Sequence, residues 1–116
     1  VIEDEAAVGR MTEKMLRSFG YDVVVAPDAA AAARIFASGA AIDLVLSDVV
    51  LPGEMSGPKF IRGLQETKPD LKVVFMSGYP TEALEGNDDL DSRHQLLAKP
   101  FQASQLAATI RKALDR

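Results

Sequence analysis

Five polar residues end apolar runs of this sequence and carry side chains that could do chemistry. Glu3 and Asp4 follow the opening Val-Ile, Asp48 ends a run in the middle of the chain, and Ser77 and Lys99 each end a later run. If these runs are strands of one parallel sheet, their carboxyl ends meet at a single edge, where ligands bind. We therefore expect the five side chains to form one functional site.

The three acids of this set, Glu3, Asp4 and Asp48, predict a bound cation. Clustered carboxylates repel one another and raise each other's pKa unless a cation lies among them. Oxygen ligands of this kind suit Mg²⁺, which keeps some of its waters and also binds phosphate oxygens. The Lys99 ammonium and the Ser77 hydroxyl could then bind the anionic group that the metal leaves uncovered. The combination suits phosphoryl transfer.

Taken one at a time, these residues have ordinary structural interpretations. Acids are common in the first turn of a helix, and we expect Glu5 to serve only there. Asp48 before a loop is typical of a turn, Ser77 next to a glycine is another turn signal, and Lys99 alone would be a surface charge. Their common place at the ends of strands favours the functional interpretation.

The elements that must position these residues follow from the hydrophobic pattern. Apolar residues at every third or fourth position predict helices over 6–19, 29–39 and 58–68, with Asp28 as an N-cap, Pro58 in a first turn and glycines after the first two helices. A final helix has Leu106, Ile110 and Leu114 on its inner face. Short apolar runs predict strands over 21–26, 44–48, 72–77 and 95–98 after a first strand at the opening of the sequence.

The strands read as continuous apolar runs, and helices separate them, so we expect a parallel sheet that is buried on both faces. The fold class is α/β, with five strands in a doubly wound sheet and helices on both sides. The segment 81–94 is acidic and has little periodicity, which predicts a short or frayed helix and a mobile loop. The opening is too short for a buried strand. We expect residues 1–116 to be one domain, a fragment of a longer chain whose first strand is clipped.

Composition excludes several classes of protein. The chain is 47% hydrophobic and 26% charged, which argues against disorder. A net charge of -4 has the wrong sign for direct nucleic-acid binding. No apolar run approaches the roughly 20 residues of a membrane span, and the start is unlike a signal peptide, so membrane insertion and secretion are not expected. With no cysteine in the sequence, the cytoplasm is the default location.

Four motifs stand in order along the sequence: Glu3-Asp4-Glu5, Leu46-Ser47-Asp48-Val49-Val50-Leu51-Pro52 with Gly57, Met76-Ser77-Gly78, and Lys99-Pro100-Phe101. Together they resemble the signature of the receiver domain of two-component response regulators, over nearly the whole chain. The Pro-Gly-Glu-Met-Ser-Gly loop and the Met-Ser-Gly-Tyr strand exit are similar in particular to receivers attached to hybrid sensor histidine kinases.

The resemblance implies a flavodoxin-like fold with strand order 2-1-3-4-5. It implies that Asp48 accepts a phosphoryl group from a phosphohistidine on a histidine kinase or a phosphotransfer domain. Asp4 and Asp48 would bind Mg²⁺ directly, together with the backbone carbonyl of Val50, and Glu3 would hold a metal-bound water. Such a domain catalyses its own phosphorylation and dephosphorylation and is not a turnover enzyme. Homodimerisation on phosphorylation is left open.

For the remaining site residues, the resemblance implies that Lys99 pairs with a phosphoryl oxygen, that the bond before Pro100 is cis, and that Ser77 moves toward the phosphoryl group. The sequence departs from the family pattern in three ways. The loop 52–57 is one residue longer, Glu3 replaces the commoner aspartate, and Leu96 stands where many receivers have Tyr or Phe. We therefore expect the segment 81–94 to supply the conformational response.

Two further residues bear on the phosphoryl lifetime. Val50 and Tyr79 are expected to border the path along which a water would attack the aspartyl-phosphate. Neither side chain suits the positioning of that water, so we expect slow dephosphorylation. The lone His94 lies in a polar stretch and is expected at the surface.

Three other functions compete with a phosphoacceptor receiver. Metal-dependent phosphatases that form an aspartyl-phosphate have an Asp-x-Asp motif. Here Val50 stands in place of the second aspartate of that motif, and its side chain cannot act as a general acid. A nucleotide- or flavin-binding module is disfavoured because no glycine-rich loop follows the first strand. A degenerate receiver that only docks is disfavoured by the complete set of acceptor residues.

Overall fold

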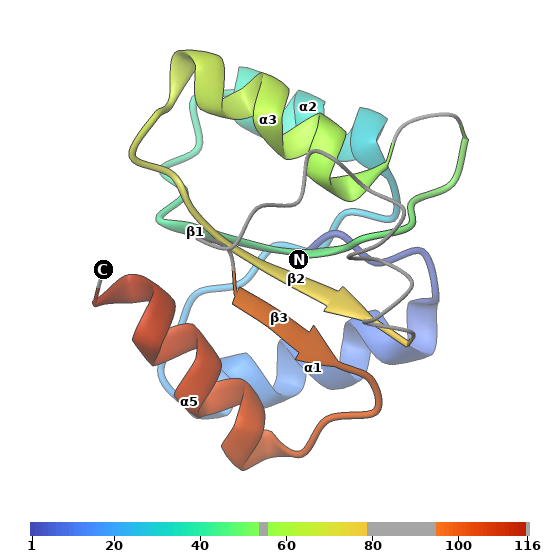
Figure 1. Ribbon diagram of the computed structural model, residues 1–116, viewed down its shortest axis with the longest axis vertical. Helices are drawn as coiled ribbons and strands as arrows, with labels where there is room; N and C mark the ends of the chain where they lie inside the picture. The colour runs from blue at the N-terminus through green and yellow to red at the C-terminus, as the bar shows by residue number, and fades with distance from the viewer. Residues whose placement is uncertain (54–55, 79–94, 116) are drawn as a thin grey trace.

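The computed structural model describes residues 1–53, 56–78 and 95–115, and in these ranges helices pack on both faces of a parallel sheet (Figure 1). The predicted α/β class is confirmed. The predicted frayed helix over 81–94, and with it His94 and Tyr79, lies outside the described residues. In chain order the elements are α1 (Ala6–Ser18), α2 (Ala29–Ala37), β1 (Leu44–Asp48), α3 (Gly57–Thr67), β2 (Lys72–Ser77), β3 (Gln95–Ala98) and α5 (Ala103–Leu114).

The helices begin and end where the sequence signals predict. Asp28 is the N-cap of α2, and its carboxylate accepts a hydrogen bond of 2.8 Å from the backbone nitrogen of Ala31. Pro58 lies in the first turn of α3, where the missing N–H costs no hydrogen bond. Gly20 after α1 and Gly39 after α2 have φ angles of 95° and 84°, which residues other than glycine rarely adopt.

The described residues form a three-stranded parallel sheet in the order β1-β2-β3. The opening segment continues this sheet on the other side of β1, because Ile2 forms parallel bridges with both Ser47 and Ala26. The predicted strand over 21–26 is therefore present only as the bridge at Ala26, and the first strand only as Ile2. The backbone hydrogen bonds of the described residues join the opening segment to Val24 and Ala26, on both sides of this bridge.

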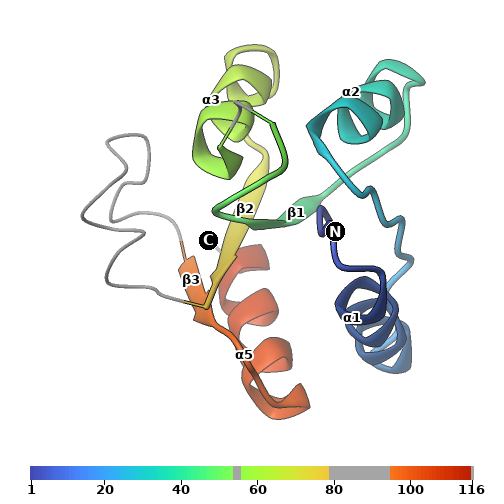
Figure 2. The same ribbon diagram turned by 90° about the vertical axis from the view of Figure 1, so that its right-hand side faces the viewer.

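Each face of the sheet has its own hydrophobic core (Figure 2). Helices α2 and α3 cover one face, where Ile2, Val45, Ile61 and Phe75 are buried. Helices α1 and α5 cover the other, where the buried residues include Leu16, Leu46, Val74 and Leu106. Alternate residues of one strand thus enter opposite cores, which explains why the strands are apolar throughout. No helix in the described part of the chain is both long and apolar enough to cross a bilayer.

Candidate functional site

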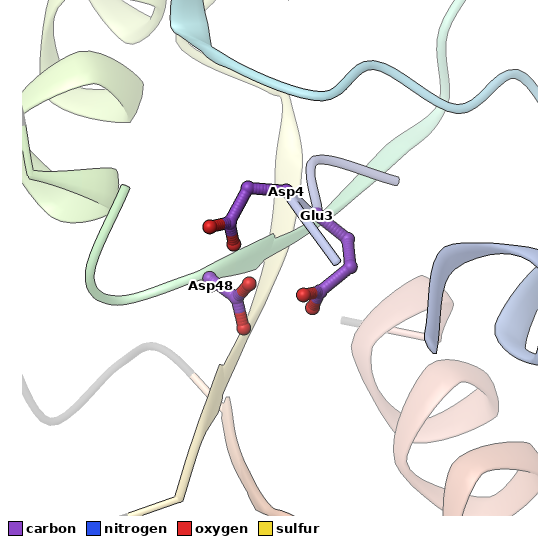
Figure 3. A group of neighbouring side chains, drawn as sticks. All are labelled: Glu3, Asp4 and Asp48. Carbon is purple, nitrogen blue, oxygen red and sulfur yellow. The ribbon is translucent and has the colours of Figure 1, made fainter. Parts of the chain in front are cut away.

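Three carboxylates meet at the edge formed by the carboxyl ends of the strands (Figure 3). Glu3 and Asp4 follow the bridge at Ile2, and Asp48 is the last residue of β1. The backbone nitrogen of Asp48 donates a hydrogen bond of 3.1 Å to the carbonyl oxygen of Ile2, which fixes the two chain ends side by side. Glu3, Asp4 and Asp48 each offer a carboxylate oxygen within 4.8 Å of the others. The predicted acidic cluster therefore forms.

Lys99 completes the cluster from the end of β3. Its Nζ lies 2.7 Å from Oε2 of Glu3 and 2.5 Å from Oδ1 of Asp48, so that one ammonium joins two carboxylates. The side chains of Glu3 and Asp48 are nearly inaccessible to solvent, whereas Asp4 is exposed. The register places Lys99 here, because Ser77 of β2 pairs with Ala98 and its carbonyl accepts the Lys99 amide at 2.9 Å.

The electrostatics of the two buried acids differ. Burial, together with the neighbouring Glu3 carboxylate, raises the pKa of Asp48 to about 7, against the opposing effect of Lys99. Burial also acts to raise the pKa of Glu3, but its interactions with Asp48, with Lys99 and with the Glu5 amide outweigh burial and lower it. Desolvation opposes the charge of Lys99, yet its two carboxylate partners raise its pKa. The pKa values of the two buried acids are thus displaced in opposite directions.

The backbone of Asp48 is held by two residues whose role sequence reasoning missed. The buried Ser47 hydroxyl donates a hydrogen bond of 2.9 Å to the carbonyl oxygen of Asp48. Gly57, at the start of α3, packs against the same carbonyl so closely that a Cβ atom there would lie 2.0 Å from the oxygen. Both residues stand in the motif around Asp48 that carries the resemblance, but no role was assigned to either of them there.

The family model of the response regulator receiver domain matches residues 1–111. The chain belongs to this family. As a receiver domain it is a module of two-component signalling, and the matched region includes every site residue that the sequence predicts.

Two relatives illustrate the contexts in which similar receivers occur. This chain is 40% identical over 117 residues to the sensor kinase CckA of Brucella abortus (strain 2308). The match covers all of this chain but only 12% of the length of CckA. The chain is 33% identical over 112 residues to the response regulator receiver protein CpdR of the same organism, in a match that covers 97% of this chain and 92% of CpdR.

Solved receiver structures share the fold. The solution structure of the PhyR receiver domain of Erythrobacter litoralis has a TM-score of 0.84 and 32% identity, covering 99% of this chain and 87% of that one. A response regulator receiver protein of Sinorhizobium medicae WSM419 has a TM-score of 0.80 and 28% identity, covering 98% of this chain and 90% of that one. The predicted receiver family is thus confirmed by sequence and by fold.

The other predicted site residues of the receiver lie at the same edge. Ser77 ends β2, and the Lys99–Pro100 peptide bond is cis, as the resemblance implies. Val50 lies two residues after the end of β1 and is 79% exposed. Its carbonyl as a metal ligand, and the movement of Ser77, stay predictions.

The receiver's cluster fits a divalent cation. Three carboxylates and one ammonium give a formal charge of -3 + 1 = -2 when all are ionised, and every candidate ligand atom of the acids is an oxygen. The direction of the Asp48 pKa agrees with this fit, because burial beside Glu3 raises it against the opposing effect of Lys99. The residues present therefore fit Mg²⁺, and Asp4 is the acid that solvent reaches.

Proposed function

We propose that Asp48 is the phosphoacceptor of this receiver domain and takes its phosphoryl group from a phosphohistidine of a histidine kinase or a phosphotransfer domain. The observation that carries the proposal is the position of Asp48. Its buried carboxylate lies between the acids of the opening segment and the ammonium of Lys99, at the sheet edge where an open α/β sheet binds its ligands.

The transfer is a displacement at phosphorus. A carboxylate oxygen of Asp48 forms the new O–P bond as the N–P bond of the phosphohistidine breaks, and the imidazole leaves with the electron pair. Asp4, Asp48 and the carbonyl of Val50 would hold Mg²⁺, with Glu3 reaching it through a water. The ion would screen the negative charge that gathers during transfer. Lys99, already beside Asp48, supplies a second positive charge for a phosphoryl oxygen.

Finer features of the domain belong to the same proposal. We infer five strands in the order 2-1-3-4-5, which the bridges from Ile2 to Ala26 and to Ser47 support. The similarity to CckA supports a receiver within a sensor kinase. A cytoplasmic location and self-catalysed dephosphorylation are also part of what we propose for the domain.

Labelling with a small phosphodonor tests the acceptor. Acetyl phosphate with Mg²⁺ should add one phosphoryl group to the protein, as measured by intact mass, and Asp48→Asn should abolish the addition. Asp43→Asn is the matched control, because Asp43 is an exposed acid that precedes the same strand at its opposite end. Labelling of Asp48→Asn at the level of the parent would refute the assignment. Steady turnover of p-nitrophenyl phosphate would instead favour the phosphatase.

A further inference from the structure

Strand β1 carries one hydroxyl within its apolar run, directly before the predicted acceptor. Ser47 is fully buried, and it lies opposite Ile2 on one side and Phe75 of β2 on the other. Because side chains alternate along a strand, Ser47 faces the same core as Val45, the one beneath α2 and α3. A hydroxyl buried among apolar side chains costs free energy unless it is hydrogen-bonded. Its bond to the Asp48 carbonyl, at 2.9 Å, is therefore the feature to explain.

The Asp48 carbonyl lies where the backbone ladder stops. In a parallel ladder the N–H and the C=O of one residue point toward the same neighbouring strand. The Asp48 amide donates to the Ile2 carbonyl at 3.1 Å, so the Asp48 carbonyl also faces the opening segment, and the amide next in register there belongs to Asp4. Among the backbone hydrogen bonds of the described residues, none joins the Asp4 amide to this carbonyl. A carbonyl in a residue as buried as Asp48 still needs a donor.

The ladder stops because the chain bends at Asp4. Successive side chains of a straight strand point to opposite faces of the sheet, so a straight strand would separate the carboxylates of Glu3 and Asp4. Here both lie within 4.8 Å of the Asp48 carboxylate, and Figure 3 shows them reaching it from different sides. The bend that assembles the acidic cluster thus removes one backbone hydrogen bond from the end of β1.

Helix α3 closes on the same carbonyl without bonding to it. A Cβ atom on Gly57 would lie 2.0 Å from the Asp48 oxygen and 3.2 Å from the Ser47 hydroxyl. The Gly57 amide itself donates to the Val49 carbonyl, at 2.8 Å. In the described part of the chain, the donor that bonds to the Asp48 carbonyl is therefore the Ser47 hydroxyl.

We propose that Ser47 is a positioning residue for the acceptor: its hydroxyl takes the place of the Asp4 amide at the Asp48 carbonyl. It thereby keeps the backbone of Asp48 fixed while the chain bends away at Asp4. This inference rests on the proposed role of Asp48. The peptide group that Ser47 holds also leads to Val50, whose carbonyl is an expected metal ligand. Ser47 thus orients the acceptor carboxylate and the metal ligands without contacting the ion or the phosphoryl group.

Replacing Ser47 by alanine removes the hydroxyl and leaves the small side chain otherwise unchanged. Loss of a group that orients metal ligands typically costs 10- to 100-fold in metal affinity or activity. We expect Ser47→Ala to bind Mg²⁺ about tenfold more weakly, as measured by isothermal titration calorimetry. Labelling of Asp48 by acetyl phosphate at saturating Mg²⁺ should also be about tenfold slower, because the acceptor oxygen is no longer held in line.

Thr12→Val is the matched control. Thr12 is also fully buried, and its hydroxyl donates to a backbone carbonyl, that of Val8 in α1, at 2.8 Å. The substitution keeps the shape of the side chain and removes a hydroxyl bond of the same kind as that of Ser47. Both variants are measured at a temperature well below their melting temperatures. Thr12→Val should keep the parent's Mg²⁺ affinity and labelling rate.

Parent values of both the Mg²⁺ affinity and the labelling rate in Ser47→Ala would overturn the inference. Equal losses in Ser47→Ala and Thr12→Val would also overturn it, because any buried hydroxyl bond would then have the same effect. The Mg²⁺ titration does not depend on phosphorylation. Labelling of Asp48→Asn at the parent's level would therefore refute the acceptor assignment alone, whereas the titration of Ser47→Ala decides the role of Ser47.

Discussion

The contact between Gly57 and the end of β1 gives the sharpest test of how the site is held. A Cβ atom on Gly57 would lie 2.0 Å from the carbonyl oxygen of Asp48, 3.1 Å from its carbonyl carbon and 3.2 Å from the Ser47 hydroxyl. The nearest atom is backbone, so it cannot rotate away as a flexible side chain would. Gly57→Ala must therefore push α3 from the end of β1 or displace the Asp48 peptide.

The size of the effect follows from three contributions. Overpacking a well-packed interior costs about 1 to 3 kcal/mol. Displacing the Asp48 carbonyl also weakens its hydrogen bond from Ser47, which contributes about 0.5 to 1.5 kcal/mol. Alanine gains up to about 1 kcal/mol over glycine in a helix interior, and less at its first residue. We expect the free energy of unfolding of Gly57→Ala to fall by about 2 to 3 kcal/mol.

Gly63→Ala is the matched control. Gly63 lies in the same helix, is exposed, and has no atom within 4 Å of the position of a Cβ. Its replacement should leave the stability unchanged or raise it by about 0.5 to 1 kcal/mol. Urea denaturation followed by circular dichroism gives both values, and acetyl phosphate labelling shows whether the displaced Asp48 still reacts. Equal unfolding free energies for Gly57→Ala and the parent would refute the steric argument.

The other predictions concern the charges of the site. Mg²⁺ should raise the melting temperature because it binds only the folded cluster, and Asp4→Ala should remove this rise; a full rise in the variant would contradict the assignment. Lys99→Ala should lower the unfolding free energy without Mg²⁺ by roughly 2 kcal/mol, because two carboxylates lose their counterion. The loss should be smaller than for a fully buried pair, since solvent partly reaches Lys99. It should keep Mg²⁺ binding, and loss of binding would refute the role of Lys99. The folded-state pKa of Asp48, about 7, lies above the ordinary value of 3.8, so the folded state holds a proton that the unfolded chain has lost. Stability without Mg²⁺ should therefore fall as the pH rises from about 4 to 7. In Asp48→Asn, the melting temperature should depend less on pH over this range. An unchanged slope in that variant would show that another group is responsible.

The elements and the acidic cluster could be predicted from the sequence because local signals agree with the fold. Asp28, Pro58 and Gly20 each stand where a helix begins or ends, and the structure confirms all three positions. Glu3 and Asp48 follow apolar runs, and the rule that parallel strands end at one edge is enough to bring them together. This rule does not depend on how far apart two residues are in the sequence, so it holds for Glu3 and Asp48, which are 45 positions apart.

Other features depend on contacts that no local pattern encodes. The sequence predicts Lys99 as an anion-binding residue, but its pairing with both Glu3 and Asp48 is set by the register of β3 on β2, where Ser77 pairs with Ala98. A shift of one residue would turn the side chain to the other face of the sheet. The predicted strand over 21–26 has the right composition, yet among the described residues only Ala26 of this segment forms a bridge, opposite Ile2.

The opening segment connects the acidic cluster to the sheet. Glu3 is held at the site by backbone bonds from Val1 to Glu3 on both sides, and its carboxylate must stay within reach of Lys99 for the cluster to exist. The acidic cluster therefore depends on this short pairing, in which the backbone of Ile2 is hydrogen-bonded to Leu46 and to Asp48 itself.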